Sequence, residues 1–92
     1  MELILTKNAS LTLQEIFFTI ELKFGSIAAE KFLLEVEKTL KLATLFPEMF
    51  KKSNSSNTRM GQVSKLTNFI YEINATSITV LYFWDNRQEP FE

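Results

Sequence analysis

The side chains that could carry out chemistry in this chain of 92 residues are few, because the two most versatile types are missing. The sequence contains no Cys and no His. A thiol nucleophile, a Cys-ligated zinc site and a disulfide framework are therefore excluded, as are hydrolases built on a Ser-His-Asp or Cys-His arrangement. Histidine is also the commonest metal ligand in proteins. We therefore expect neither a metal site nor a cofactor.

The remaining candidates are cations in the second half of the chain. They are Lys51, Lys52, Arg59, Lys65 and Arg87. A guanidinium can clamp a carboxylate or a phosphate through two hydrogen bonds, so Arg59 and Arg87 are candidates for binding an anionic partner. A solvated position explains both equally well, and Arg87 could instead pair with a neighbouring acid and fix the tail. For the two adjacent lysines, a solvated loop is the simpler interpretation.

Length and composition indicate one globular domain spanning residues 1–92. The chain has 46% hydrophobic and 23% charged residues, with only two Gly and two Pro, which is unlike a disordered or collagen-like sequence. No apolar run approaches the ~20 residues of a membrane helix, and no secretory signal is present. We therefore expect a cytoplasmic protein that does not bind membranes. A net charge of −1 does not indicate a nucleic-acid binder.

The first half of the chain predicts a short edge strand followed by a helical hairpin. Residues 1–6 alternate in the manner of a strand. A helix follows, with Asn8 or a capping box at Thr12–Glu15 as its start and Gly25 as its stop. A second helix runs from Ser26 to about Phe46 and ends before Pro47. The two-residue link forces the helices into a hairpin.

Both helices carry an apolar stripe suited to a core. In the first helix it comprises Ala9, Leu13, Ile16, Phe17, Ile20 and Phe24, and in the second Ala29, Phe32, Val36, Leu40 and Ala43. Leu33, Leu34 and Leu45 widen the stripe of the second helix. The first helix also carries a second stripe, Leu11, Phe18 and Leu22, off the core side. This second stripe predicts a binding surface for a partner helix, because exposed apolar patches mark such surfaces. The alternative is that both faces of the hairpin pack within the chain.

The second half predicts a loop over residues 47–57 and three strands over 59–66, 69–73 and 77–84, followed by an irregular tail from Asp85. Strands joined by short turns form an antiparallel meander. The order β-α-α-β-β-β therefore indicates an α+β fold in which the hairpin covers one face of the sheet. The apolar run 78–84 favours an interior strand, and we expect Tyr71, Tyr82 and Trp84 to serve in packing.

Read in order, these pieces resemble the RelE/ParE toxin superfamily of bacterial type II toxin–antitoxin systems. The residues that carry the resemblance are Ala9, Leu13 and Ile16, Phe24-Gly25, Ala28-Ala29 with Phe32, Leu45-Phe46-Pro47, Arg59, Phe69-Ile70-Tyr71, and the Asp-x-Arg-Gln-x-Pro tail at 85–90. The resemblance implies the same α+β fold, with the first strand joining the later three. It also implies neutralisation by a cognate antitoxin in a hetero-oligomer, and a role in plasmid stabilisation.

The resemblance leaves two activities and one inactive alternative open. RelE-like members are ribosome-dependent mRNA endonucleases that use a basic cluster; the matching positions fall near Gly61 and Asn68, and Phe91 has no hydroxyl to replace their C-terminal Tyr. We therefore favour a ParE-like inhibitor that binds DNA gyrase, with Arg59 and Arg87 as target contacts. A nuclease would have to use Arg59, Lys65 and Arg87. The acidic pI of about 5.5 also fits a degenerate, non-toxic binding module. Antitoxin contacts would be Leu11, Phe18, Leu22 and Arg59.

Overall fold

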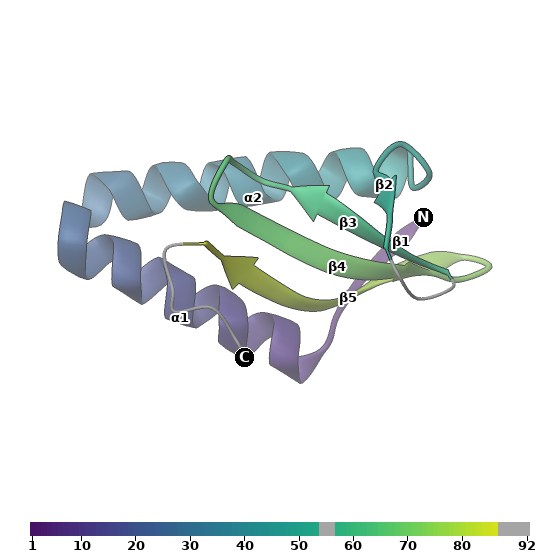
Figure 1. Ribbon diagram of the computed structural model, residues 1–92, viewed down its shortest axis with the longest axis horizontal. Coiled ribbons are helices and arrows are strands. Elements are labelled where there is room, and N and C mark those ends of the chain that lie inside the picture. Colours follow the sequence, from purple (N-terminus) through teal and green to yellow (C-terminus); the bar gives the residue numbers. More distant parts are fainter. Residues whose placement is uncertain (54–56, 87–92) are drawn as a thin grey trace.

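The protein is described from a computed structural model, which covers residues 1–53 and 57–86. Two helices form one layer and a mixed sheet forms the other (Figure 1). In chain order the elements are β1 (Glu2–Leu5), α1 (Lys7–Phe24), α2 (Ser26–Leu45), β2 (Lys51–Lys52), β3 (Thr58–Gln62), β4 (Thr67–Ile73) and β5 (Ser77–Asp85). The predicted α+β class, with a helical hairpin on a mainly antiparallel sheet, is confirmed.

The sheet has five strands in the order β1-β5-β4-β3-β2. β1 runs parallel to β5, and every other pair of neighbours is antiparallel. The first strand therefore joins the later ones at an edge, and β5 is interior, as the sequence predicts. Strand β2, which pairs with β3, lies within the segment predicted to be loop, so that prediction was wrong for Lys51 and Lys52.

The prediction of a strand over residues 59–66 was also wrong at its end, because β3 stops at Gln62. The backbone turns immediately afterwards, where the Val63 N–H donates to the carbonyl of Thr67 over 2.9 Å. The Ser64 hydroxyl accepts from the N–H groups of Leu66 and Thr67. A serine side chain that bonds nearby backbone in this way offers an alternative to strand pairing.

Helix α1 begins earlier than expected, because its N-cap is Thr6, two residues before Asn8 and six before Thr12. The Thr6 hydroxyl accepts from the Ala9 N–H at 2.9 Å, as an N-cap side chain does. At the other end, Gly25 has φ 95° and ψ 171°. The predicted stop at Gly25 is confirmed, and its φ is positive, although the residue is extended in ψ rather than in the left-handed helical region. This conformation reverses the chain directly into α2.

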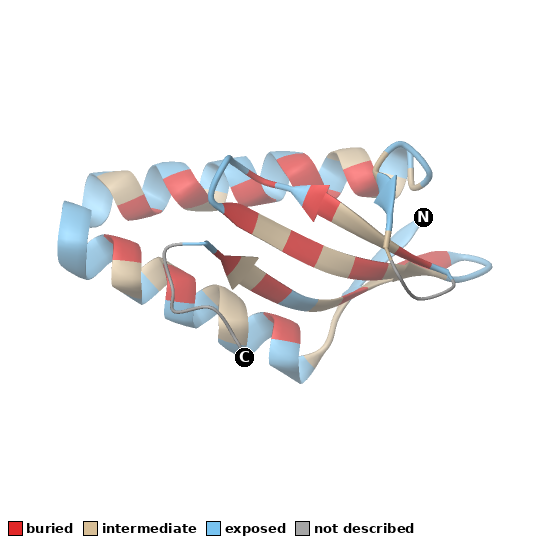
Figure 2. Ribbon diagram, in the orientation of Figure 1, coloured by how far each residue is buried: buried red, intermediate tan, exposed pale blue. Residues whose placement is uncertain are grey.

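The core lies between the hairpin and the sheet, along the inner sides of both helices (Figure 2). In α2 the five residues of the central predicted stripe are buried, but Leu34 and Leu45, predicted to widen it, are 65% and 59% exposed because they lie on the outer side of the helix. In α1, Ala9, Ile16 and Ile20 are buried, whereas Phe24, predicted to be core, is 61% exposed at the helix end. Residue Asp85, predicted to open an irregular tail, instead ends β5 and is buried against Thr67 of β4. No helix within residues 1–53 and 57–86 is long and apolar enough to cross a bilayer.

Candidate functional site

A bulge in β5 sets the arrangement of side chains on the sheet. Ile70 of β4 pairs with Tyr82, but the next residue, Tyr71, pairs with Val80, so Leu81 is an extra residue. Because a bulge breaks the two-residue alternation of a strand, Val80 and Phe83 both face the helices. Tyr82 and Trp84 consequently lie on the face of the sheet that the helices leave uncovered.

Two threonines of the N-terminal region satisfy the backbone that the bulge releases. The Thr6 hydroxyl donates to the carbonyl of Leu81 at 2.9 Å. The Thr12 hydroxyl accepts from the N–H of Phe83 at 2.9 Å and can itself donate to the carbonyl of Asn8. These bonds hold the first half of α1 against β5, beside the uncovered face of the sheet.

Between α1 and this uncovered face lies a groove of about 750 Å³. The described side chains that line it are Asn8, Thr12, Glu15, Met60, Asn68, Phe69, Ile70, Tyr82, Phe83 and Trp84. Most of this lining is apolar or aromatic. Among the described lining residues Glu15 is the one charged side chain, and none is Lys or Arg. We refer to this feature below as the α1–β5 groove.

Two aromatic side chains of β5, Tyr82 and Trp84, line the groove from the uncovered face of the sheet. Tyr82, expected to pack, is 41% exposed. Trp84 lines the groove, and its indole Nε1–H is buried without a hydrogen-bond partner among the described residues. Buried donors are nearly always paired in folded proteins, so this indole is a notable feature of the site. The alternation of residues 77–84 could not reveal either placement, because the bulge shifts the pattern by one residue.

Arg59 lies on the other face of the sheet, away from the groove. Its Nη1 donates to the carbonyls of Glu48, at 3.1 Å, and Phe50, at 2.8 Å. On the paired strand, the Tyr71 hydroxyl donates to the carbonyl of Pro47. Burial raises the pKa of Tyr71 above its usual value of 10.0, and the charge of Arg59 partly opposes that shift. Together the two side chains hold the segment after α2 against the sheet.

The comparisons with known proteins identify the fold. No protein-family model matches the chain, and no curated protein sequence matches it. Among solved structures, the chromosomal ParDE TA system from P. aeruginosa aligns with a TM-score of 0.81 at 16% identity, over 92% of this chain and 95% of that one. The chain has the RelE/ParE toxin fold. The YoeB/ParE toxin from Agrobacterium tumefaciens aligns with a TM-score of 0.63 at 10% identity, over 92% of this chain and 98% of that one. The YoeB dimer from Staphylococcus aureus aligns with a TM-score of 0.61 at 12% identity, over 91% of this chain and 94% of that one.

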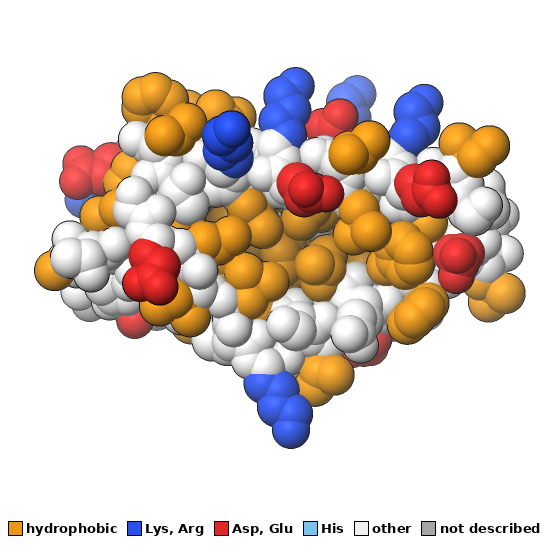
Figure 3. All heavy atoms as spheres, turned by 180° about the vertical axis from the view of Figure 1, so that it is seen from behind, with side chains coloured by type: hydrophobic (Ala, Val, Ile, Leu, Met, Phe, Trp, Pro, Cys, Tyr) orange, Lys and Arg blue, Asp and Glu red, His pale blue; other side chains and the backbone are white. Residues whose placement is uncertain are grey.

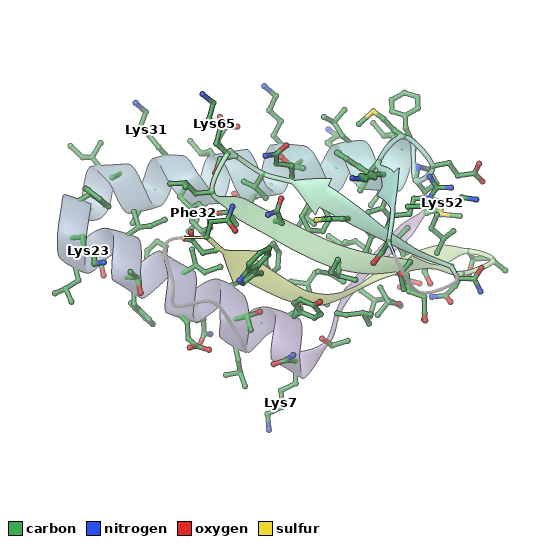
Figure 4. All side chains as sticks on the ribbon, viewed as in Figure 1. Lys7, Lys23, Lys31, Phe32, Lys52 and Lys65 are labelled. Atoms are coloured by element: carbon green, nitrogen blue, oxygen red, sulfur yellow. The ribbon has the colours of Figure 1, made fainter. Side chains whose placement is uncertain are left out.

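On this RelE/ParE fold, the structure does not bring the predicted nuclease cations together. Arg59 is bound to the segment after α2, whereas Lys65 lies in the turn between β3 and β4, at the opposite end of β3. Its side chain extends outward past α2 in the same direction as Lys31 (Figure 4). Arg87 lies outside the described residues. Within residues 1–53 and 57–86, no cluster of three potential metal ligands is found.

The second apolar stripe of α1 is exposed as predicted. The exposed fractions are 48% for Leu11, 59% for Phe18 and 88% for Leu22. The hairpin exposes further large apolar side chains, namely Phe24, Ile27, Leu34 and Leu45. Seen from the helix side, hydrophobic side chains gather in a hollow across the middle of the molecule, with charged side chains along its borders (Figure 3). This RelE/ParE hairpin thus presents apolar surface that no element of the described chain covers.

Proposed function

We propose that this chain is the toxin subunit of a bacterial type II toxin–antitoxin pair, that it acts in the cytoplasm in a ParE-like manner, and that it binds and inhibits DNA gyrase. The observation that carries this proposal is the alignment with the chromosomal ParDE system, which extends over nearly all of both chains. The mechanism is binding rather than covalent chemistry.

The lining of the α1–β5 groove favours this mechanism over the RelE-like alternative. Cleavage of RNA builds up negative charge on the reacting phosphate, and an enzyme stabilises that charge with cations that converge on it. The described groove offers Glu15 and no cation. A nuclease of this fold would have to use Arg59, Lys65 and Arg87, of which the first two lie apart.

The cognate antitoxin is the second partner that we propose. Leu11, Phe18 and Leu22 recur at helical spacing along one side of α1, and an amphipathic antitoxin helix would pack its own apolar face against them. We propose that Arg59 supports partner binding by fixing the segment after α2, in addition to any direct contact with a partner. Arg87 remains our proposed target contact in the tail.

Inducible expression in a bacterial host tests the proposal when gyrase supercoiling and mRNA integrity are measured in parallel. We expect growth arrest, loss of supercoiling and intact mRNA. Arrest with mRNA cleaved at the ribosomal A site would replace our proposal with the nuclease. Normal growth, with the protein folded and no antitoxin present, would identify a non-toxic binding module.

Substitutions in the apolar stripe of α1 test the proposed antitoxin surface separately. The double variant Phe18→Glu with Leu22→Glu should remain toxic but escape neutralisation when the antitoxin is co-expressed. Leu34→Glu is the matched control, because Leu34 is exposed to a similar degree, at 65%, on α2. Equal neutralisation of all three proteins would contradict the proposed surface.

A further inference from the structure

The outer side of α2 combines exposed apolar and basic side chains in one stripe. Successive residues of an α-helix are offset by about 100° around its axis. On that basis, the side chains opposite the buried ones of α2 are Ile27, Lys31, Leu34, Lys38, Lys41 and Leu45. All of them are exposed, and among the described residues these lysines form no ion pair. We call this set the α2 outer stripe, and its side chains are available to a partner.

The outer side of α1 is the electrostatic complement of this stripe. Leu11, Phe18 and Leu22 lie opposite the buried side chains of α1, and the exposed Glu15 lies one turn after Leu11. We call these residues the α1 outer stripe. The sequence of α1 contains no cation over residues 8–22. One helix thus presents apolar side chains with a carboxylate, and the other presents apolar side chains with lysines.

The two stripes lie on opposite edges of the molecule. Lys7, one turn before Leu11, extends from α1 at one edge, and Lys31 extends from α2 at the other (Figure 4). The space-filling view shows a row of Lys and Arg side chains along the α2 edge (Figure 3). Because each molecule carries both complementary surfaces on opposite edges, the α1 outer stripe of one copy can meet the α2 outer stripe of another.

The stripes also match in length and in register. The helices have 18 and 20 residues, which corresponds to about 27 and 30 Å. In one antiparallel register, the residues at equal height are Leu11 and Leu45, Glu15 and Lys41, Phe18 and Lys38, and Leu22 and Leu34. Apolar pairs then stand at both ends, with an ion pair between them. The remaining lysine lies on an aromatic ring, which favours both its stem and its charge.

Other occupants of the α2 outer stripe fit less well. Two copies packed α2 on α2 would bring lysines together, and like charges repel. A nucleic acid presents phosphates and would leave Ile27, Leu34 and Leu45 without apolar partners. An anionic membrane would meet Glu30 and Glu37, which are exposed beside the lysines on the same helix. A second copy of this chain satisfies both the apolar and the charged side chains.

We propose that this chain associates head to tail, with the α1 outer stripe of one copy packed antiparallel on the α2 outer stripe of the next and Glu15 against Lys41. Such a heterologous contact leaves an unused stripe at each end, so the assembly lengthens as the concentration rises. An antitoxin helix on the α1 outer stripe would block the contact. The association therefore belongs to the chain without antitoxin, and it does not depend on toxicity.

Sedimentation velocity of the purified full-length chain, over a wide range of concentration, measures the association. The parent should form dimers and longer oligomers. Phe18→Glu disables the α1 outer stripe and Leu34→Glu disables the α2 outer stripe, so each variant alone should stay monomeric. Both positions are exposed, and circular dichroism checks that both variants fold.

Mixing the two variants distinguishes a head-to-tail contact from a two-fold one. An equimolar mixture of Phe18→Glu and Leu34→Glu should form a one-to-one pair and nothing longer, because one intact stripe of each kind remains. The control is Gln62→Glu, which places an acid at an exposed position of β3. This control should associate as the parent does.

A charge reversal tests the register. Glu15→Lys and Lys41→Glu should each weaken the association about fivefold, as loss of an exposed ion pair does. Mixing these two variants should restore the parental strength, because each new cation then faces a new carboxylate. Their separate weakening without recovery on mixing would overturn the register and the proposal with it.

Three further results would overturn the proposal. They are a parent that stays monomeric at every concentration, self-association of Phe18→Glu or Leu34→Glu alone, and a mixture of these two that forms no pair. Self-association of one variant would indicate a two-fold contact through its intact stripe. None of these measurements involves gyrase or antitoxin. Failure here would therefore leave the proposed toxin function standing, and failure of that function would leave this contact standing.

Discussion

The hydroxyl of Thr12 on α1 accepts a hydrogen bond from the backbone N–H of Phe83 on β5, across 2.9 Å and 71 positions of sequence. The bond fixes the helix to the strand next to the bulge at Leu81. It thereby sets the distance between the two sides of the α1–β5 groove. A side chain in the first half of α1 thus helps to maintain the architecture of the candidate site.

Replacing Thr12 by Val should destabilise the protein by about 1–3 kcal/mol, because the partly buried Phe83 N–H loses its partner while the volume of the side chain is kept. Denaturant unfolding measures the difference. Thr12→Ser should restore most of the stability, since the hydroxyl returns. The control is Thr19→Val, which removes only a bond to the Glu15 carbonyl within the helix. Equal losses in Thr12→Val and Thr19→Val would contradict this assignment.

The ring of Phe69 lies over Gly61 on the neighbouring strand, and a Cβ at Gly61 would come within 2.2 Å of it. Gly61→Ala should therefore cost about 1–3 kcal/mol through overpacking of the core. Thermal unfolding measures the loss. Adding Phe69→Leu, which shortens the side chain, should recover part of it. A double variant that is less stable than the sum of the two single changes would argue against steric conflict.

A substitution at Gly25 tests strain in the backbone rather than the packing of side chains. A Cβ there would meet nothing within 4 Å, yet its φ of +95° is one that other residues rarely adopt. Gly25→Ala should cost about 1–3 kcal/mol from backbone strain alone. Unlike the loss at Gly61, this loss should not be recovered by Phe69→Leu. An unchanged melting temperature would show that the hairpin does not depend on this conformation.

The raised pKa of Tyr71 predicts a dependence of stability on alkaline pH. Burial favours the neutral phenol, so its pKa is higher in the folded than in the unfolded protein. The resulting stabilisation is complete below pH ~10, the pKa of an unperturbed Tyr, and is lost as the pH rises through the folded value.

Tyr71→Phe removes this ionisation together with the hydrogen bond to the Pro47 carbonyl. The variant should be less stable than the parent by about 0.5–1.5 kcal/mol at neutral pH. The difference in unfolding free energy between the parent and the variant should become smaller above pH ~10, because ionisation of Tyr71 then costs the parent stability. Denaturant unfolding from pH 7 to 11 measures both proteins. A gap that stays constant over that range would contradict the burial of a neutral phenol.

Arg59 should act mainly through stability, because its guanidinium bonds two carbonyls of the segment after α2. Arg59→Met keeps much of the side-chain volume but removes both bonds. We expect a loss of about 1.5–3 kcal/mol and faster proteolysis near Phe50. A variant with parental stability that no longer inhibits gyrase would instead make Arg59 a direct target contact.

Much of the fold could be predicted from local signals. Gly25 and Pro47 mark the ends of the helices, and the central apolar stripe of α2 identified its buried face, although Leu34 and Leu45 at the margins of the stripe are exposed. Other features depend on contacts between distant residues. Thr6 caps α1 instead of Asn8 because its hydroxyl also bonds Leu81, far away in the sequence. The short strand β2 exists only because Lys51 and Lys52 pair with β3.

The candidate site was less accessible from the sequence. The exposed stripe on α1 was visible as surplus apolar residues off the core side. The groove was not, because it depends on the bulge at Leu81, which the alternation of β5 does not reveal. Strict alternation along β5 places Tyr82 and Trp84 on the same face as the buried Ile78 and Val80, which is why the sequence predicts that they serve in packing. The hydrogen bonds of Arg59 to main-chain carbonyls are equally invisible to a reading of side-chain types.

The most direct test of the central claim is a DNA supercoiling assay with purified gyrase and the purified full-length chain, run beside an mRNA-integrity assay in a translating extract. Our account predicts that the chain abolishes supercoiling, that cleaved DNA accumulates, and that the mRNA stays intact. Unimpaired supercoiling together with cleaved mRNA would contradict it.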